Sequence, residues 1–488
     1  FNDRKECKTD DVFLCSSLET RVLGIGGTFQ NGYHNTGLSS PSPFIRSFIN
    51  SSWVDRYKEP APPHMVTMIW SLIVSLYGLG AFFGSLSINF VSRMLGRKMA
   101  AVCNGGICVA AGGIMLASKA VGSYEMIIAA RTLYGFSAGL GQGIHLMYLA
   151  EISPTNIRGT VCQSAATFLS LGKLSAQFIG LSEILGQEDL WNILLFIPAL
   201  FSVVQILGLP FLPDAPRYLF IEKGDEKACK QALQSLWGEG EYREEIDEML
   251  AEHAALERAP PKSTLQFLKD QDVRWQLVSI SVIVCCSVLS GISVVTIFSY
   301  DILLRSGIPI NKIRYITVGQ GLCDTLTSIF CGLLIERAGR RVMLWGGFGV
   351  MSATMVLITV MLQLQHSHFW ASYVTVILIM LLIIFNGGAG GVGMTLNGEL
   401  FVQSDRLAAF AVTGSQRYLL FSVVGMTFPF LIKALDSYCF LLFSCVCTVG
   451  CLYTFFILPE TKGKTMMEIS NEFKAITICG KSKEEKGA

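Results

Sequence analysis

The 488-residue sequence has few charged side chains, since Asp, Glu, Lys and Arg make up only 15% of it. A soluble globular domain usually carries about 25% charged residues. The hydrophobic share is 51% and the mean hydropathy is +0.49, so the chain needs lipid as its solvent. The formal net charge is +1, which gives no indication of a nucleic acid or of an acidic partner.

The 15 cysteines show neither metal-ligand spacing nor the density of a small disulfide-bonded secreted domain. Most lie within apolar stretches, as Cys103, Cys285 and Cys447 do, and we interpret them as small apolar packing residues. No nucleophile–base–orienter set and no metal cluster stands out, so we expect neither an enzyme nor a cofactor. The polar start, residues 1–11, lacks the apolar core of a signal peptide.

Long apolar runs, each close to the roughly 20 residues that cross the hydrocarbon core, recur along the whole chain. The clear runs are Trp70–Phe90, Met99–Ala117, Tyr124–Leu146, Trp191–Phe211, Gln276–Leu304, Val342–Leu364, Trp370–Leu396, Ala408–Ile432 and Tyr438–Leu458. The weaker runs are Leu18–Ser39, Val161–Leu181 and Ile313–Ile335. Polar side chains at Gln30, Asn31 and His34 interrupt the first of these. Together the runs predict about twelve membrane-spanning helices.

The longest hydrophilic interruption, residues 214–274, divides the apolar sequence into halves of similar length. We therefore expect an N-terminal segment (1–17), a six-helix half (18–213), a connecting loop with short helices (214–274), a second six-helix half (275–458) and a tail (459–488). Lys and Arg gather in the connecting loop, the tail and two short loops (93–98 and 337–341), which predicts that these and both termini are cytoplasmic. The sequon Asn50-Ser51-Ser52 then falls outside, where Asn50 would accept an N-glycan.

Three motifs of the first half recur in the second half. The pairs are Gly96–Lys98 with Gly339–Arg341, Glu151–Arg158 with Glu399–Arg406, and Pro213–Arg217 with Pro459–Lys462. In the second pair, glutamate and arginine lie seven residues apart in both copies. All three pairs are offset by about 245 residues, which is typical of a transporter built from two parallel repeats of six helices.

The charged residues of these motifs lie at predicted cytoplasmic helix ends. Ion pairs among them could hold the two halves together in the outward-open state and break in the inward-open one. The candidates are Arg97, Arg131, Glu151, Arg158 and Arg217 in the first half, and Glu336, Arg340, Glu399 and Arg406 in the second. The alternative is that these charges only set the topology, which accounts for the arginines but not for acidic partners at matched spacing. Because an exposed pair contributes only roughly 0–1 kcal/mol, gating needs a buried or collective network.

From about Gly26 to Glu468 the sequence resembles the facilitative hexose transporters, sugar porters of the major facilitator superfamily. The motifs that carry the resemblance are Gly27–Tyr33, the two Gly-Arg loops, Glu151 with Arg158, Pro213–Arg217, Ser290–Ile292 and Pro459–Thr465. The run Gly388–Val392 and Asp324 resemble the second branch, which includes fructose and urate carriers. The resemblance implies an all-α plasma-membrane protein of two six-helix bundles, which binds a sugar in a central cavity and transports it by uniport.

The sugar contacts of that family match this sequence only in part. Gln177 matches, whereas Ser293 and Arg417 replace asparagines, and the pair of glutamines before Ser290 is missing. Asn397 lies near the position of a tryptophan that the second branch also lacks. Neutral amides hold a pyranose by bonding several hydroxyls at once, so their loss argues against high-affinity glucose transport.

Other polar residues stand close to these positions. Lys173 precedes Gln177 by four residues, which places both on one face of a helix, and Gln142 precedes His145 by three residues on another helix. We predict that these four side chains contribute to the substrate site. The alternatives are that Lys173 extends to the membrane surface and that His145 is a packing residue.

Asp324 and Arg417 carry opposite charges on helices whose polar residues contact sugar in the related transporters. An unpaired charge inside the membrane costs several kcal/mol and a paired one costs less, so we expect an ion pair between them. The pair would leave Lys173 as the uncompensated positive group and would favour a solute with a negative or electron-rich edge. The alternative is a purely structural pair that does not touch the solute.

Three hypotheses on function remain open at this point. The first is a facilitative carrier of fructose or glucose, which needs only the lipid bilayer and a small solute, without nucleic acid, metal or an obligate protein partner. The second is a carrier of an organic anion such as urate, which Lys173 and Arg417 favour. The third is a transport-inactive paralogue that acts as a receptor or scaffold. Fold alone does not decide between them.

Overall fold

The computed structural model describes residues 22–461 and 472–473, with gaps at 153–157, 222, 238–241, 243–245, 248, 251–253, 255–263, 271–272, 366, 369 and 402. The described chain folds into helices, and it separates into two compact units, Phe1–Pro261 and Lys262–Ala488. The boundary between the units lies inside the hydrophilic segment 214–274.

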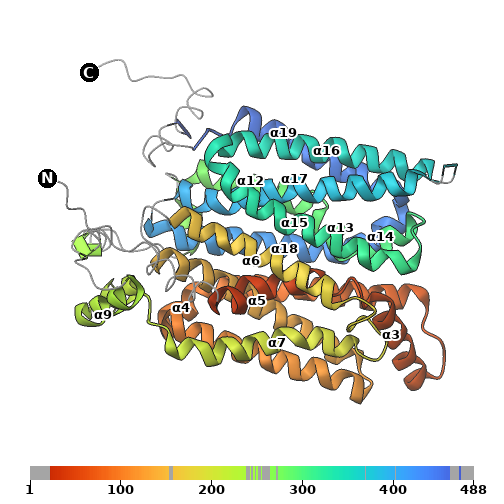
Figure 1. Cartoon of the computed structure of the whole chain (residues 1–488), viewed down its shortest axis with the longest axis horizontal. Helices are drawn as coiled ribbons and strands as arrows, with labels where there is room; N and C mark the ends of the chain where they lie inside the picture. The colour runs from red at the N-terminus through yellow and green to blue at the C-terminus, as the bar shows by residue number, and fades with distance from the viewer. Residues whose placement is uncertain are drawn as a thin grey trace. The chain divides into compact units, whose positions relative to one another are not determined.

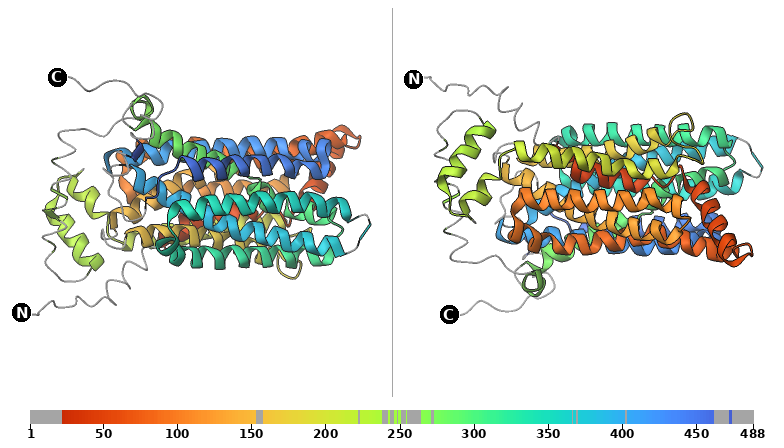
Figure 2. Two further views of the ribbon diagram at one scale, coloured as in Figure 1. Left: turned by 90° about the horizontal axis from the view of Figure 1, so that it is seen from above. Right: turned by 90° about the horizontal axis from the view of Figure 1, so that it is seen from below.

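Unit 1 begins with a π-helical turn that continues directly into an α-helix. Its described elements are η1 (Ile25–Phe29), α2 (Gln30–Thr36), α3 (Ser42–Tyr57), α4 (Pro63–Val121), α5 (Tyr124–Ile152), α6 (Arg158–Ile179), α7 (Trp191–Gly208), η2 (Leu209–Phe211), α8 (Pro216–Ile221) and α9 (Glu226–Trp237). Gly96, with φ 78° and ψ 171°, interrupts α4, so this long element holds two crossings. The amphipathic helix α9 lies beyond the ends of the long helices of this unit (Figure 2).

Unit 2 is also built of long helices, and its first crossing is interrupted. Its described elements are α11 (Thr264–Lys269), α12 (Arg274–Leu289), α13 (Ile292–Ile297), α14 (Ser299–Arg305), α15 (Ile310–Ala338), α16 (Arg340–Leu364), α17 (Trp370–Leu400), α18 (Gln403–Leu435), η3 (Asp436–Tyr438) and α19 (Cys439–Phe456). The predicted continuous run Gln276–Leu304 is wrong in detail, because the chain breaks at Gly291, which has φ 82°, and again at Phe298. The long helices α15, α16 and α17 run side by side (Figure 1).

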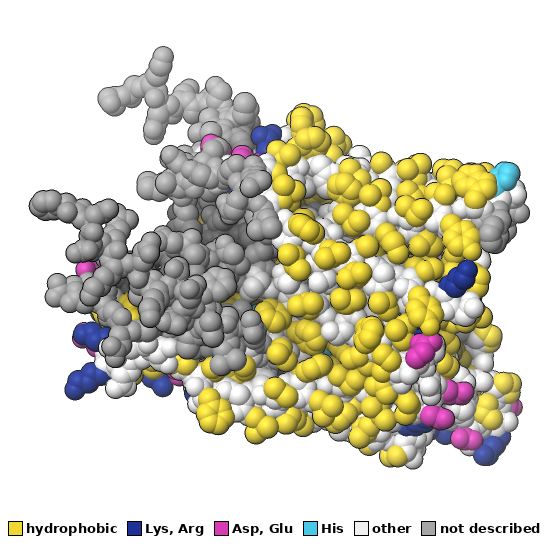
Figure 3. All heavy atoms as spheres, in the orientation of Figure 1, with side chains coloured by type: hydrophobic (Ala, Val, Ile, Leu, Met, Phe, Trp, Pro, Cys, Tyr) yellow, Lys and Arg dark blue, Asp and Glu magenta, His cyan; other side chains and the backbone are white. Residues whose placement is uncertain are grey.

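Among the described residues, six stretches are long and apolar enough to cross a membrane. Two of them, Pro63–Val121 and Ala408–Phe456, each hold two crossings. The segment η1–α2 and the helices α5, α6 and α15 do not meet this criterion and complete the expected set of about twelve. Hydrophobic side chains cover much of the face in Figure 3, and the charged side chains visible there lie mostly toward its ends, as lipid contact requires.

Close backbone contact joins α4 to α5 in unit 1. A Cβ atom on Gly80 or Gly84 of α4 would lie 2.1 or 2.2 Å from a carbonyl oxygen of α5. A Cβ atom on Gly135 or Gly139 of α5 would lie 2.0 or 2.2 Å from a carbonyl oxygen of α4. Small residues in both helices therefore let the backbones touch, which is how membrane helices gain packing energy without a hydrophobic effect between them.

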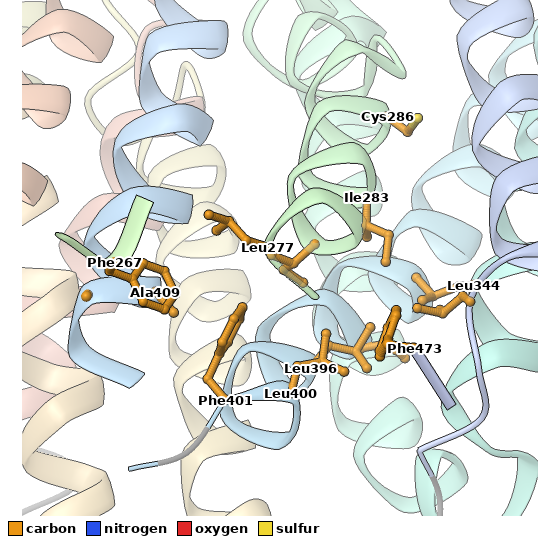
Figure 4. Packing of buried hydrophobic residues seen from close by; sticks show 14 of the residues in the cluster. Phe267, Leu277, Ile283, Cys286, Leu344, Leu396, Leu400, Phe401, Ala409 and Phe473 are labelled. Atoms are coloured by element: carbon orange, nitrogen blue, oxygen red, sulfur yellow. The ribbon is translucent and has the colours of Figure 1, made fainter. Parts of the chain in front are cut away.

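A hydrophobic cluster near the Gly339 end of unit 2 fixes α11 against the long helices (Figure 4). Phe267 of α11 is fully buried, and its ring centroid lies 5.4 Å from that of Phe401 in an edge-to-face contact. Leu277 of α12, Leu344 of α16 and Leu396 of α17 belong to the same cluster. The short helix that precedes the first crossing of unit 2 is thus part of its core.

Candidate functional site

Five of the eight predicted substrate residues lie on spanning segments that fall short of the hydropathy criterion. Gln142 and His145 lie on α5, Lys173 and Gln177 on α6, and Asp324 on α15. Segment η1–α2 also falls short and carries Asn31 and other buried polar side chains. Polar groups inside a membrane are rare, and they need partners within the protein.

His145 is enclosed within unit 1. It is 1% exposed, and its Nδ1 lies 3.1 Å from Thr28 Oγ1 of η1. A Cβ atom on Gly27 would lie 3.0 Å from the Cβ of His145, so the ring is held close against η1. This position suits a packing residue that joins α5 to the first helix, and a direct contact with solute stays a prediction.

Gln142, one turn earlier on α5, takes part in a chain of hydrogen bonds that joins three helices. Tyr77 of α4 donates its hydroxyl to Asn31 Oδ1 at 2.8 Å. Asn31 of α2 donates its Nδ2 to Gln142 Oε1 at 2.9 Å. Tyr77 is fully buried, Asn31 is 3% exposed, and Gln142 is half-buried. The chain therefore runs from the interior of the bundle to a partly open side chain.

The neighbouring Gln30 makes its bonds on the other side of α2. Its Nε2 donates to Ser202 Oγ at 2.7 Å and to the Pro198 carbonyl oxygen at 3.2 Å, both on α7. Its Oε1 accepts from Cys108 Sγ of α4 at 3.4 Å. Gln30 is 3% exposed, as Asn31 is. Two adjacent amides of one helix thus bond to different neighbours.

Lys173 and Gln177 lie one turn apart on α6, as predicted from their spacing. Thr36 of α2 donates its Oγ1 to the Lys173 carbonyl oxygen at 3.1 Å, which ties the two helices together here. Gln177 is 6% exposed, and its Oε1 has no hydrogen-bond partner in the described part of the chain. A buried acceptor left without a donor costs about 1–3 kcal/mol, and a ligand hydroxyl would supply the donor.

Arg131 does not belong to the predicted charged network, and its assignment there was wrong. It precedes Glu151 by 20 residues on α5, which is about 30 Å along a helix. Its guanidinium lies 4.4 Å from the centre of the Tyr77 ring and 3.5 Å from the carbonyl oxygens of Ile73 and His34. The motif spacing could not reveal this, because Arg131 lies outside the repeated motifs.

His34 shares this buried region with Arg131. Its ring is stacked at a tilt on Tyr134, with centroids 4.2 Å apart, and it is 3% exposed. Neither ring nitrogen has a hydrogen-bond partner within the described residues. Aromatic contacts therefore hold this imidazole in place.

The prediction of an ion pair between Asp324 and Arg417 is wrong. Both side chains belong to the described residues, and no ion pair joins them. Asp324 is 5% exposed on α15, and its Oδ1 lies 3.6 Å from where a Cβ atom on Gly387 of α17 would stand. Arg417 lies on α18, next to Gln416, which donates to the Ser281 carbonyl oxygen of α12 at 3.1 Å. The carboxylate thus faces α17, a direction that helix identity alone did not reveal.

Ser293 lies on the short helix α13, directly after the break at Gly291. It is half-buried, and its carbonyl oxygen accepts from Thr296 Oγ1 at 3.0 Å. Asn397 lies on α17, but its side chain is outside the described residues. The contacts of both with a solute stay predictions.

A buried ion pair lies at the Gly96 end of unit 1. Arg97 Nη2 lies 2.8 Å from Glu151 Oε1, and its Nε donates to both carboxylate oxygens at 3.0 and 3.2 Å. The side chains are 6% and 14% exposed. The Arg97 guanidinium also lies 4.7 Å from the centre of the Tyr218 ring. Two parallel bonds to a carboxylate, plus an aromatic face, make this a strong pair.

Glu460 takes a different role at the corresponding end of unit 2. Its Oε1 accepts from the backbone N–H of Arg340 at 2.9 Å and its Oε2 accepts from that of Arg341 at 3.1 Å. These are the first residues of α16, so the carboxylate caps a helix N-terminus. Gly339 has φ 87°, and a Cβ atom there would lie 2.8 Å from Glu460 Oε2. Only glycine fits this approach.

For the other members of the predicted network, the structure gives no contact that would assign them to it. Arg217 is 5% exposed on α8. The side chains that lie outside the described residues are those of Arg158, Glu336, Glu399 and Arg406. A gating role for the network stays a prediction.

Sequence patterns alone do not select Tyr77, Asn31 or Glu460 as site residues. Asn31 was interpreted only as a polar interruption of the first span, and Tyr77 as part of an apolar run. Glu460 was noted for its place in a repeated motif, without a partner. In each case the useful signal was a polar group whose partner lies on another helix, which spacing along one segment does not reveal.

We expect Glu151→Gln to lower the free energy of unfolding by about 3–5 kcal/mol, because Arg97 would keep a buried charge without its counter-ion. Thermal unfolding of the purified protein in detergent measures this. The matched control is Asp189→Asn, which removes the partner of Lys119 from a pair in which Asp189 is 93% exposed. That loss should stay below about 1 kcal/mol. Equal effects of the two substitutions would contradict the importance of the buried pair.

Comparison with known proteins gives one consistent result. Residues 21–473 match the family described as "Sugar (and other) transporter". The chain is 39% identical over 461 residues to human "Solute carrier family 2, facilitated glucose transporter member 9", covering 94% of this chain and 85% of the relative. It is 35% identical over 467 residues to rat member 5 of the same solute carrier family, covering 96% and 93%. These relatives are named as transporters.

Solved structures extend the likeness to the fold. The xylose transporter XylE from E. coli, in a partially occluded inward open conformation, matches with a TM-score of 0.76 at 16% identity, covering 93% of this chain and all of that chain. The "MFS (major facilitator superfamily) proton:xylose symporter XylE bound to 6-bromo-6-deoxy-D-glucose" matches with a TM-score of 0.77 at 17% identity, covering 95% and 99%. The predicted all-α major facilitator fold is thereby confirmed.

Proposed function

We propose that this chain, which belongs to the sugar (and other) transporter family, carries a hexose such as fructose or glucose across a membrane by uniport. The observation that carries the proposal is the similarity, over nearly the whole chain, to proteins named as facilitated glucose transporters. The prediction of a multi-pass membrane transporter that is not an enzyme agrees with that membership. We further infer that the membrane is the plasma membrane and that both termini are cytoplasmic.

The polar side chains of unit 1 support a neutral, hydroxyl-rich solute. Gln177 Oε1 is buried without a donor in the described part of the chain, and Gln142 is a half-buried amide on α5. An amide offers both a donor and an acceptor to sugar hydroxyls, and each unsatisfied group on either partner costs affinity. We therefore assign these two amides to the solute, with Lys173 and Ser293 as further candidates.

The paired motifs support alternating access as the transport mechanism. Arg97 and Glu151 form a buried pair in unit 1, and Glu460 caps α16 in unit 2. Both interactions lie at the ends of spanning helices, beside glycines with positive φ that change the chain direction. Breaking and reforming polar contacts at such ends is a way to bias two access states, provided that the states differ in those contacts.

The organic-anion hypothesis rests on Arg417, which has neither an acidic partner nor a hydrogen bond among the described residues. A buried cation without a partner would attract a negative solute. The names of the relatives do not favour this alternative, so the hexose is our conclusion. A transport-inactive receptor is the remaining alternative, and uptake itself tests it.

We expect reconstituted protein to take up radiolabelled fructose or glucose, and urate and small organic anions at no more than about a tenth of that rate. Proteoliposomes with the purified chain, compared with empty liposomes, measure the panel. Gln177→Leu should raise KM for the hexose by about fivefold to tenfold, because one net hydrogen bond contributes about 1 kcal/mol. Uptake of urate without hexose uptake would establish the second hypothesis, and uptake of neither would favour the receptor.

The orientation of the membrane protein has a separate test at Asn50. Asn50 is exposed on α3, and its Oδ1 accepts the backbone N–H of Ala61 at 3.1 Å, which leaves Nδ2 as the atom for a glycan. We expect glycosidase treatment of protein from cultured cells to increase electrophoretic mobility, and Asn50→Gln to abolish that increase. Cleavage within the connecting loop, residues 214–274, by a protease added to intact cells would contradict this orientation.

A further inference from the structure

Helix α7 contains a proline in its interior, Pro198. Proline has no backbone N–H, so the Leu194 carbonyl oxygen lacks the donor that an N–H at position 198 would supply. Leu194 is fully buried inside a spanning helix, where water does not serve as a donor. A buried carbonyl group without a donor is unfavourable, so this break in α7 needs a partner from another helix.

Tyr33 of α2 is that partner. Its hydroxyl donates to the Leu194 carbonyl oxygen at 2.9 Å, and the residue is fully buried. A phenol carries a single proton, so this bond uses the only one that Tyr33 can donate. The hydrogen bond that proline removes from α7 is thus replaced by one from a neighbouring helix.

The first crossing bonds to α7 on both sides of the break. Three residues before Tyr33, Gln30 Nε2 donates to the Pro198 carbonyl oxygen at 3.2 Å and to Ser202 Oγ at 2.7 Å. Tyr33 therefore holds the turn of α7 that precedes the proline, and Gln30 holds the turn that follows it. Both donors lie on α2, so one helix spans the break in the other.

Close packing surrounds the same part of α7. A Cβ atom on Gly26 of η1 would lie 1.8 Å from Gln205 Cδ. A Cβ atom on Gly112 of α4 would lie 2.4 Å from the Cβ of Ala199, the residue that follows the proline. The break is therefore enclosed by neighbouring helices as well as bonded to one of them.

We propose that α2 bridges the Pro198 break and thereby joins α2 and α7 into one rigid body. Tyr33 supplies the donor that proline lacks, and Gln30 bonds to the far side of the break. A proline inside a helix is ordinarily a place where the helix bends. Here α7 keeps its shape while the carrier changes between its two access states. The part of this inference that concerns transport rests on the proposed function, whereas the bridge itself does not.

Tyr134 of α5 offers a matched control. Its hydroxyl donates to the Leu195 carbonyl oxygen of α7 at 3.0 Å, and the residue is 1% exposed. The chemistry and the burial match those of Tyr33, but this carbonyl lies four residues before Ala199, which has an N–H of its own. Loss of the Tyr134 hydroxyl therefore leaves the Leu195 carbonyl with a helical donor, whichever residue stands at position 198.

The first test is a double-mutant cycle that needs no solute. Tyr33→Phe should lower the thermal midpoint of the purified protein in detergent by about 3 °C, because the Leu194 carbonyl loses its donor. In Pro198→Ala the new N–H bonds to that carbonyl, so the same substitution should then lower the midpoint by about 1 °C or less. Tyr134→Phe should give one shift in both backgrounds. Equal shifts of Tyr33→Phe in both backgrounds, or a shift of Tyr134→Phe that also depends on position 198, would overturn the bridge.

The second test is initial hexose uptake by proteoliposomes. Tyr33→Phe should lower the maximal rate about fivefold and leave KM within about twofold, because it loosens a moving part and touches no solute. Adding Pro198→Ala should restore the rate to within about twofold of that of the wild type. An unchanged or faster rate in Tyr33→Phe would overturn the rigid joint, and a faster one would show that α7 bends at its proline. Absence of uptake by the wild type would overturn the proposed function, while the thermal cycle would still decide whether the bridge exists.

Discussion

A polar side chain in the middle of a membrane helix has no water to bond, and its partners must come from neighbouring helices. In unit 1 this constraint is met around the first helix. Thr28 contacts α5, Gln30 donates to α7, and Asn31 joins α4 to α5. This first crossing, which falls short of the hydropathy criterion, is therefore bound to several other helices through hydrogen bonds, and close glycine contacts between α4 and α5 complete the packing. The polar residues that weaken its hydropathy also hold it in place.

Charged groups at the helix ends obey the same constraint in two ways. In unit 1 the Arg97 guanidinium is neutralised by Glu151 and covered by Tyr218. In unit 2 the Glu460 carboxylate accepts hydrogen bonds from backbone N–H groups at the start of α16. Both contacts lie beside a Gly-Arg loop of a repeated motif. A switch between access states needs bonds that are specific and yet replaceable, and hydrogen-bonded charges at helix ends have both properties.

Hydropathy was enough to predict the spans, because lipid dictates length and apolarity for each helix. The repeated motifs indicated the two halves, and the resemblance of these and other motifs indicated the family. Local backbone changes were harder to predict: the run Gln276–Leu304 reads as continuous, and only the positive φ of Gly291 explains the break. The partners of individual side chains were the hardest feature to predict. Asp324 faces α17 and not Arg417, and Arg131 lies about 30 Å from Glu151, because spacing along one helix does not fix which neighbour a side chain meets. Asn31, which looked like a weakness of the first span, is one of its main contacts.

The central claim is that the chain moves a hexose down its gradient without coupling to an ion. The most direct measurement is the final internal concentration of labelled hexose in proteoliposomes, with and without an imposed proton or sodium gradient. A uniporter changes the rate of equilibration and not its end point, so we expect internal and external concentrations to become equal under all conditions. An internal concentration several times higher than the external one, present only with the gradient, would show instead that transport is coupled to the ion.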